Sequence, residues 1–278
     1  MMWIFLLIIL AILCIIIFFS IPYSPISTTY HRIVREKISA EPSVSGVFTE
    51  KDIEKLPLVL QKYFHYCGYL GTPKMSYMKA FFKNVDFVMS PGKTIKVNYQ
   101  QLNMVSRPER FALITSSLFS IPFEGLDSFD KGGGSMKGIL AKVIPLFNQC
   151  GESMDRASLV TWLAECLLVP NAALQDFITW KEVDSTHAEG TISWKKISAS
   201  GIFTFTEDGE LLSFRTSDRV AVDMQGKETE ADWSAYFRNY HTVNGILQPG
   251  ILQSVWHYQD GDVIYFNKNE SVVDIRYQ

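Results

Sequence analysis

The sequence predicts an α+β fold that is mostly β. We expect a curved antiparallel sheet or incomplete β-barrel of about 10–12 strands that encloses a central helix, and an N-terminal transmembrane helix. Three features lead to this prediction. Residues 3–21 are almost continuously apolar, residues 153–175 are apolar at helical spacing on more than one side, and most other segments are short runs rich in Val, Ile, Phe, Tyr and Thr. A helix that is apolar on several sides is buried on several sides, so the sheet has to curve around it.

Composition and charge favour one large domain and exclude some classes of partner. The chain has 278 residues, 47% hydrophobic and 13% aromatic, which is enough to fill a sizeable core. Its formal net charge of -3 shows no basic excess, so we expect no nucleic-acid partner. The 4 cysteines lack paired spacing and the 5 histidines are scattered. We therefore expect buried structural thiols, no metal site and no cofactor.

The apolar run at residues 3–21 contains no charged residue and only Ser20 as a polar interruption. As a helix it extends roughly 28 Å, about the hydrocarbon thickness of a bilayer. A cleaved signal peptide has basic residues before its apolar core and small residues before the cut, whereas no Lys or Arg precedes this run and Phe18 and Phe19 lie near its end. We expect a retained single-pass anchor that contacts the lipid bilayer through residues 3–21.

The basic residues Arg32, Arg35 and Lys37 follow the run, and only the terminal amine precedes it. The positive-inside rule then favours a cytoplasmic body. Three charges at this distance are a small bias, so the side of the membrane stays open.

The chain divides into a transmembrane anchor at 1–22, a stalk at 23–48 and a single β-rich domain at 49–278. The stalk is predicted from its Pro, Ser and Thr content and its lack of strong periodicity. The domain begins with an amphipathic helix capped by Thr49, in which Pro57 either starts a second helical segment or kinks the first.

The strand signals form two groups, one before and one after the central helix. Turn residues separate the strands within each group. They include the Asn244-Gly245 and Asp260-Gly261 pairs, which suit tight hairpins. The glycines 132–134 are interpreted as a flexible strand connection. The predicted strands are 75–89, 94–104, 111–119, 125–130, 135–147, 178–183, 188–194, 197–206, 211–217, 230–240, 246–258 and 263–276.

Within the central helix, which Pro170 should end, Glu165 is the only charged residue between Arg156 and Asp176. If it is buried it needs a partner, because an unpaired ionised group in an apolar setting costs several kcal/mol. Arg215 or Arg219 could serve. Two readings stay open: Glu165 pins the helix to the sheet, or it orients a ligand at a cavity mouth.

The aromatic strand faces and the central helix form either a packed core or a lined cavity, which periodicity cannot distinguish. The glycine-rich turn lacks the pattern of a nucleophile elbow or a phosphate loop, so we identify no catalytic residues and expect no enzyme. The candidate ligand-binding residues are Glu165, Trp162, Phe203, Phe205, Arg215 and Trp233.

A series of short patterns, taken in chain order, carries a resemblance. They are 56–64 with Cys67-Gly68, 127–129 with 132–136, 163–165 with 170–174, 201–205 with Asp208-Gly209 and Phe214, and then Trp233, Tyr240, Gly245 and Pro249. Over about residues 55–278 the chain resembles a bacterial, membrane-anchored family of domains of unknown function. The family's architecture is similar to that of periplasmic lipoprotein carriers (LolA/LolB-like), an incomplete β-barrel with helices closing its mouth. The resemblance implies a location in the cell envelope.

Three hypotheses follow for the function. The first is a membrane-tethered protein that binds or carries an apolar, lipid-like ligand between the concave sheet face and the central helix. The second is a structural or protein-interaction module of a cell-envelope assembly. An enzyme ranks third. The ligand, the protein partners and the oligomeric state are not determined by the sequence.

Overall fold

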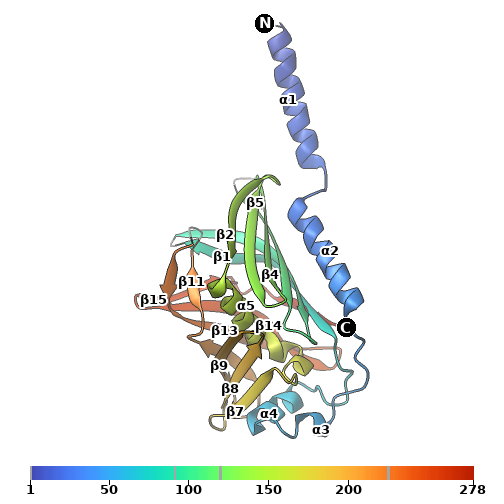
Figure 1. The fold of residues 1–278 in the computed structure, drawn as a ribbon, viewed down its shortest axis with the longest axis vertical. Coiled ribbons are helices and arrows are strands. Elements are labelled where there is room, and N and C mark those ends of the chain that lie inside the picture. The colour runs from blue at the N-terminus through green and yellow to red at the C-terminus, as the bar shows by residue number, and fades with distance from the viewer. Residues whose placement is uncertain (1, 91, 119–120, 224–225) are drawn as a thin grey trace.

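The computed structural model describes residues 2–90, 92–118, 121–223 and 226–278 (Figure 1). In this part of the chain, 14 strands form one antiparallel sheet in the order β6-β5-β4-β3-β2-β1-β15-β14-β13-β10-β9-β8-β7, with β16 paired to β1. The strands β11 and β12 form a separate hairpin. Because β6 and β7 end the sheet and do not pair with each other, the sheet is curved but not closed. The prediction of a mostly β, incomplete barrel around a helix is confirmed.

The strand bounds separate a first meander from a second group. The first comprises β1 Tyr77–Ser90, β2 Lys93–Met104, β3 Arg110–Leu118, β4 Ile121–Asp130, β5 Gly133–Leu140 and β6 Ile144–Cys150. The second comprises β7 Ile178–Glu182, β8 His187–Trp194, β9 Ile197–Phe205, β10 Leu211–Thr216, β11 Val220–Val222, β12 Glu228–Glu230, β13 Asp232–Val243, β14 Ile246–Tyr258, β15 Gly261–Phe266 and β16 Val273–Tyr277.

Two predicted strands are each divided in the structure, and one hairpin was not predicted. The segment 135–147 is split between β5 and β6 by a turn in which Ala141 and Lys142 have positive φ, at 53° and 67°. Turns with positive φ are usually recognised by Gly, Asn or Asp, and this one has none of them. The segment 263–276 is similarly divided between β15 and β16, and β11–β12 occupies a segment expected to be a connection.

The helices lie at the start and in the middle of the chain. They are α1 Met2–Ser20, α2 Pro25–Ala40, α3 Glu50–Ile53, α4 Leu58–Tyr66 and α5 Glu152–Glu165, followed by the 3₁₀ turns η1 Cys166–Leu168 and η2 Pro170–Ala172. Pro57 begins a second helical segment, one of the two expected outcomes. The predicted helix 153–175 is α-helical only to Glu165, after which the tighter turns lead to Pro170. As predicted, the chain places this helix inside the curved sheet (Figure 1).

Most of the segment expected to be a stalk, residues 23–48, is the helix α2. Ile26 and Tyr30 of α2 pack against Leu102 and Phe111 on the convex face of the sheet. Lys37, in the last turn of α2, forms ion pairs with Glu109 at 2.8 Å and Asp130 at 2.6 Å. The helical spacing of Ile26, Tyr30 and Lys37 is weak in the sequence, because polar residues fill most of the segment. A helix fixed at both ends to the sheet belongs to the folded domain.

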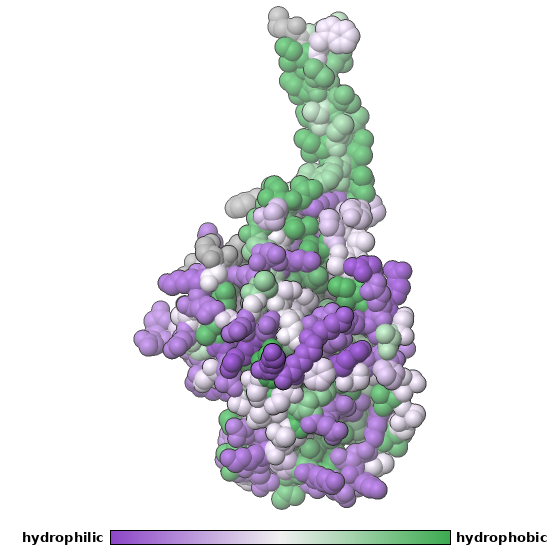
Figure 2. Space-filling model, in the orientation of Figure 1, coloured by the Kyte–Doolittle hydropathy of each residue, from purple (hydrophilic) through white to green (hydrophobic). Residues whose placement is uncertain are grey.

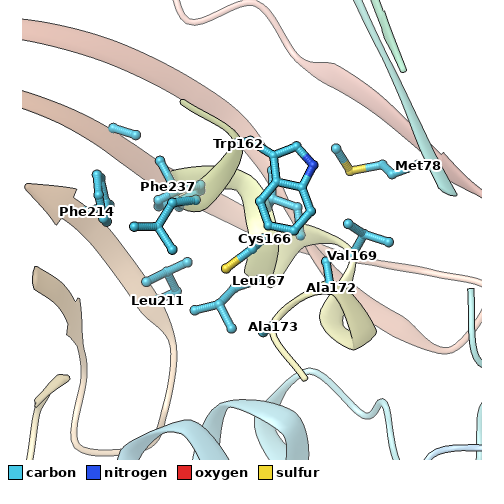
Figure 3. Close-up of a cluster of buried hydrophobic side chains, with 14 of the residues drawn as sticks. Met78, Trp162, Cys166, Leu167, Val169, Ala172, Ala173, Leu211, Phe214 and Phe237 are labelled. Carbon is cyan, nitrogen blue, oxygen red and sulfur yellow. The ribbon is translucent and has the colours of Figure 1, made fainter. Parts of the chain in front are cut away.

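The concave face is filled where α5, η1 and η2 lie against it (Figure 3). We call this region the base, represented by Met78, Trp162, Leu167, Phe214 and Phe237, each at most 1% exposed. Figure 3 shows side chains of α5 and η1 pointing toward those of β10 and β13. A core of this density stabilises the fold through burial of apolar surface, roughly 1.5–3 kcal/mol for each large side chain.

The glycine-rich turn has a structural role beyond flexibility. A Cβ atom on Gly134 would lie 2.3 Å from the carbonyl oxygen of Met154, at the start of α5. The amide of Gly134 also donates a hydrogen bond of 2.6 Å to Asp155. Since any side chain would push the helix away, glycine is required for α5 to approach β5 this closely.

The helix α1 is the one described helix that is long and apolar enough to cross a membrane. None of its residues is buried. The C-terminal end of α1 lies next to the β5–β6 turn. There Lys142 Nζ donates hydrogen bonds to the carbonyl oxygens of Phe18 at 3.1 Å and Ile21 at 2.6 Å. Figure 2 shows α1 as an apolar column whose apolar surface continues onto the adjoining end of the domain.

Candidate functional site

Glu165, the last residue of α5, is bound by three side chains of the sheet. Its Oε2 accepts hydrogen bonds from Gln101 Nε2 at 2.7 Å, Asn103 Nδ2 at 2.8 Å and Arg110 Nε at 3.0 Å. Gln101 and Asn103 are two residues apart on β2, so they share the concave face. The carboxylate is therefore satisfied by partners from β2 and β3, and the end of α5 is fixed to these strands.

Arg110 links this carboxylate to a second one. Its Nη1 donates to Asp127 at 2.7 Å and its Nη2 donates to the hydroxyl of Tyr99 at 2.7 Å. Burial alone would lower the pKa of Arg110, but the charges of Glu165 and Asp127 and the nearby Tyr99 outweigh it, so the pKa is raised. The guanidinium is held as a permanent cation between two carboxylates. We call this group, with Gln101 and Asn103, the Glu165 network.

A second arginine on the concave side has a different environment. The guanidinium carbon of Arg219 lies 4.6 Å from the ring centroid of Trp233 and 5.0 Å from that of Trp256. Its Nη1 donates to Thr161 Oγ1 on α5 at 3.0 Å, while its buried Nε has no hydrogen-bond partner among the described residues. Burial lowers the pKa of Arg219, and Tyr265 offsets this in part. Arginine remains charged even so, because the guanidinium is too strong a base to be deprotonated in a protein.

Beyond the base, the concave face has apolar side chains that are only half buried. We call these residues the shelf: Phe87, Ile95, Leu140, Tyr265 and Phe266. They pack against the core on one side, with Phe87 and Tyr265 in edge contact at 6.0 Å between ring centroids. Four of the five shelf residues lie on β1, β2 and β15. Strand β1 also contributes Met78 to the base, and β2 and β15 are its neighbours in the sheet.

The hairpin β11–β12 reaches from the second group of strands to the edge of the first. The side chain of Gln149 on β6 donates a hydrogen bond of 2.5 Å to the carbonyl oxygen of Asp223 in the hairpin turn. A hollow of about 400 Å³ lies between this hairpin, β6 and the N-terminus of α5, lined by Phe147, Met154, Val222 and Glu228 among others. The hairpin thus covers one side of the opening between α5 and the sheet edge.

The six candidate residues fall into different places. Glu165 lies in its network, and Trp162, Phe203, Phe205 and Trp233 are buried on the concave side, where Phe203 packs against Phe214 and Trp233 holds Arg219. Arg215 does not join them. It lies on the opposite face of β10, exposed at 57%, and pairs there with Asp232 at 2.9 Å. Their role in ligand binding stays a prediction.

The predicted partner of Glu165 is wrong. Neither Arg215 nor Arg219 pairs with it, and Arg110 does. Since Phe214 points inward, alternation along β10 already directs Arg215 outward. Arg110, Gln101 and Asn103 were not predicted from the sequence. One signal was available: Tyr99, Gln101 and Asn103 place polar atoms at alternate positions of a strand, on one face.

The cysteines and histidines give no metal centre in the described part of the chain, where no group of three or more His, Cys, Asp or Glu side chains gathers around one point. Cys67 and Cys166 are buried, as expected for structural thiols, whereas Cys150 is exposed beside the hollow. Burial raises the pKa of the Cys67 thiol to about 12.

Comparison with known proteins adds a family and one structural likeness. A LolA superfamily protein from Nitrosomonas europaea, of known crystal structure, is similar at 10% sequence identity with a TM-score of 0.41, and the match covers 79% of this chain and 92% of that chain. No curated protein matches the chain. The model of the DUF6544 family, described as a family of unknown function, matches residues 46–268. The resemblance to a family of unknown function is thereby confirmed, and the chain belongs to the DUF6544 family.

Proposed function

We propose that this protein is a single-pass, membrane-anchored binding protein that holds a lipid-like ligand on the shelf. The anchor is α1, whose 19 residues are apolar except for Ser20, extend roughly 28 Å and are not buried within the domain. In water such a helix would expose its full apolar surface, and a bilayer removes that cost.

The domain is fixed relative to this anchor through α2. Ser24, just before α2, hydrogen-bonds to Glu124 on β4, and Lys37 at its other end pairs with Glu109 and Asp130. Only residues 21–24 separate α1 from α2. The short connection and the docked helix hold one end of the β1–β6 meander next to the anchor.

That end of the meander has the composition of a membrane-contacting rim. Val143 and Ile144 in the β5–β6 turn are 64% and 50% exposed, and Ile121 at the start of β4 is exposed as well. Lys142, which precedes Val143 in the same turn, donates hydrogen bonds to carbonyl groups at the C-terminal end of α1. Apolar tips flanked by a lysine fit the interface between acyl chains and headgroups, where the lysine reaches the polar layer.

The observation that supports ligand binding most is the half-buried shelf at this same end. Consecutive strands of a meander reverse direction, so the β1–β2 and β5–β6 connections lie at one end of the sheet. Phe87 and Ile95 pair across β1 and β2 near the first connection. Inward-facing apolar side chains are left incompletely covered there, which favours an apolar ligand that arrives from the adjacent bilayer.

We also propose binding rather than catalysis. Glu165 and Asp127 lie on the concave side, and both accept hydrogen bonds from Arg110. Glu165 Oε2 and Asp127 Oδ2 are thus already engaged by a protein donor. These two groups therefore serve the fold rather than a reaction.

The test is whether lipid copurifies with the full chain and depends on the shelf. The full chain is extracted in a non-ionic detergent, and bound lipid is measured by native mass spectrometry and by organic extraction. We expect Phe87→Ser to lower lipid occupancy about tenfold, because it removes one large apolar contact. Val88→Ser, on the opposite face of the same strand, is the matched control. Equal occupancy in wild type and Phe87→Ser would contradict the proposal.

The free edge of β6 supports a second candidate, a protein-interaction module. β6 ends the sheet and its residues Ile144 and Asn148 are exposed, so another protein's strand could pair with it. A crosslinker placed at Asn148 that recovers one stable partner in cells, in a chain free of bound lipid, would favour this function over the first.

A further inference from the structure

We propose that Arg219 binds the negatively charged oxygen atoms of the ligand, so that the ligand is an anionic amphiphile with a carboxylate or phosphate group. This inference rests on the proposed lipid-binding function and specifies the chemical class of the ligand. Its basis is the difference between the charged partners of Arg110 and those of Arg219, the two arginines described on the concave side.

Arg110 is neutralised by protein groups, whereas Arg219 is not. Arg110 has two carboxylates within 3.0 Å of its nitrogens. Among the described residues, no carboxylate lies within 4.0 Å of the Arg219 nitrogens, and the polar groups that interact with them are the hydroxyls of Thr161 and Tyr265. A buried cation without a counter-ion costs several kcal/mol, and each of the two indole rings offsets about 1–2 kcal/mol of this cost.

The Nε side of the guanidinium suits an oxyanion. Nη1 donates to Thr161 and the Tyr265 hydroxyl also interacts with the guanidinium, but the buried Nε has no acceptor among the described residues. The guanidinium is planar and offers its N–H groups as a fork that matches the geometry of carboxylate and phosphate. The indoles of Trp233 and Trp256 fix the plane of this fork, so that little side-chain entropy is lost when an anion binds.

The shelf continues directly from Arg219. The ring of Trp256 stacks on Tyr265, a shelf residue, at 5.9 Å and 27°, and the Trp233 indole nitrogen donates to the Tyr265 hydroxyl at 3.1 Å. Tyr265 in turn contacts Phe87. An acyl chain on the shelf would therefore end next to the fork, with its charged group at Arg219 and its tail toward the rim.

The position of Arg219 also relates the ligand to the hairpin. Arg219 immediately precedes β11, and its Thr161 contact joins the base of the hairpin to α5. An anion bound here would touch the segment that covers the opening. The built site thus consists of the fork, two indoles and a half-buried apolar surface.

The experiment compares two probes that differ only in charge. Oleate and oleyl alcohol are each titrated into delipidated full chain in non-ionic detergent, and the bound fraction is measured by native mass spectrometry. We expect wild type to prefer oleate about tenfold or more, since a charge-assisted hydrogen bond in a buried site is worth about that ratio. A second pair, dioleoylphosphatidylglycerol and dioleoylglycerol, tests whether a phosphate is preferred to a neutral headgroup in the same way.

Three variants identify the residue. Arg219→Met should abolish the preference for oleate while oleyl alcohol still binds within about twofold. Arg219→Lys should keep part of it, because a point charge remains without the fork. Arg215→Met, on the outer face of β10, is the matched control and should keep the preference. Oleate should raise the melting temperature of wild type but not that of Arg219→Met, which also shows whether that variant folds.

The outcomes separate this inference from the proposed function. Equal binding of oleate and oleyl alcohol by wild type, or a preference that survives in Arg219→Met, overturns the anion site and leaves lipid binding intact. Binding of neither probe by wild type overturns the proposed function and this inference with it.

Discussion

Strands β1 and β2 pass through two regions whose inward-facing side chains have different environments. Met78 in the base and Phe82 next to it are buried, and at the other end of the same strands Phe87 and Ile95 are half exposed. The alternation of the strands continues through both regions, apart from a bulge between Phe82 and Val85. What differs is the cover, because α5 and the turns after it fill the base and stop short of the shelf. Packing is complete where stability is needed and incomplete next to the proposed anchor.

The same difference holds for charge. In the base, Arg110 donates hydrogen bonds to the carboxylates of Glu165 and Asp127 and to the side-chain oxygens of Gln101 and Tyr99. Beside the shelf, Arg219 contacts two indole rings and the hydroxyls of Thr161 and Tyr265, without a carboxylate within 4.0 Å among the described residues. A buried charge with all its partners stabilises one arrangement of the chain, whereas a buried charge without a counter-ion is costly, which is the basis for the proposed anion site. The predictions below test whether the two regions divide stability and binding in this way.

The largest effect is expected in the Glu165 network. Glu165→Gln leaves Arg110 with a single carboxylate and replaces an acceptor of three hydrogen bonds by an amide. Breaking a buried charge pair by removing one partner costs about 3–5 kcal/mol of unfolding free energy. Urea unfolding of the full chain in detergent, followed by tryptophan fluorescence, measures it. A loss of unfolding free energy below about 1 kcal/mol, together with a clear loss of bound lipid, would mean that Glu165 contributes to ligand binding rather than to stability.

The same substitution in each region gives a matched comparison. Leu163→Ala creates a cavity in the base and is expected to cost about 3 kcal/mol, because Leu163 is fully buried. Leu140→Ala on the shelf should cost about 1 kcal/mol. Lipid occupancy should show the reverse order, with the larger drop for Leu140→Ala. If Leu163→Ala lowered lipid occupancy more than Leu140→Ala at equal folded fraction, the assignment of the ligand to the shelf would be wrong.

Thiol reactivity distinguishes the packed interior from the opening. At pH 8 the buried Cys67, whose pKa is raised to about 12, is almost wholly protonated and is covered by the core. Cys150, exposed beside the hollow, should react with iodoacetamide at least about a hundredfold faster. Peptide mapping by mass spectrometry follows each cysteine separately. Comparable rates for Cys67 and Cys150 in the folded chain would mean that the base opens readily.

The smallest effect is expected for the ion pair on the outer sheet face. Asp232 has its pKa lowered by hydrogen bonds from Ser217 and Arg215, so its contribution to stability is present above the unfolded pKa of about 3.9 and is lost as the pH falls through the lower folded value. Asp232→Asn should therefore cost less than about 1 kcal/mol at pH 7, because the pair is exposed to solvent, and nothing near pH 2. Urea unfolding at both pH values measures the difference. A cost equal to that of Glu165→Gln would remove the distinction between buried and exposed pairs.

Much of the fold was predictable because its signals are local. The apolar run of α1, the helix at α5 with apolar residues on several sides and the β-rich remainder all follow from side-chain chemistry within short windows. The site was less predictable. Glu165 stood out as a charge in an apolar helix, but its partner Arg110 is 55 residues away, and only strand pairing brings them together.

The sequence by itself determined that this chain has a long apolar N-terminal helix, a β-rich body and a carboxylate that requires a partner. Only the tertiary structure decided which face of β2 is inside. Alternation assigns Leu102 and Met104 to the core and Gln101 and Asn103 to solvent, whereas the structure has all four buried. The reason is that α2 covers the convex face over the two apolar residues, while the Glu165 network on the concave face satisfies the polar pair.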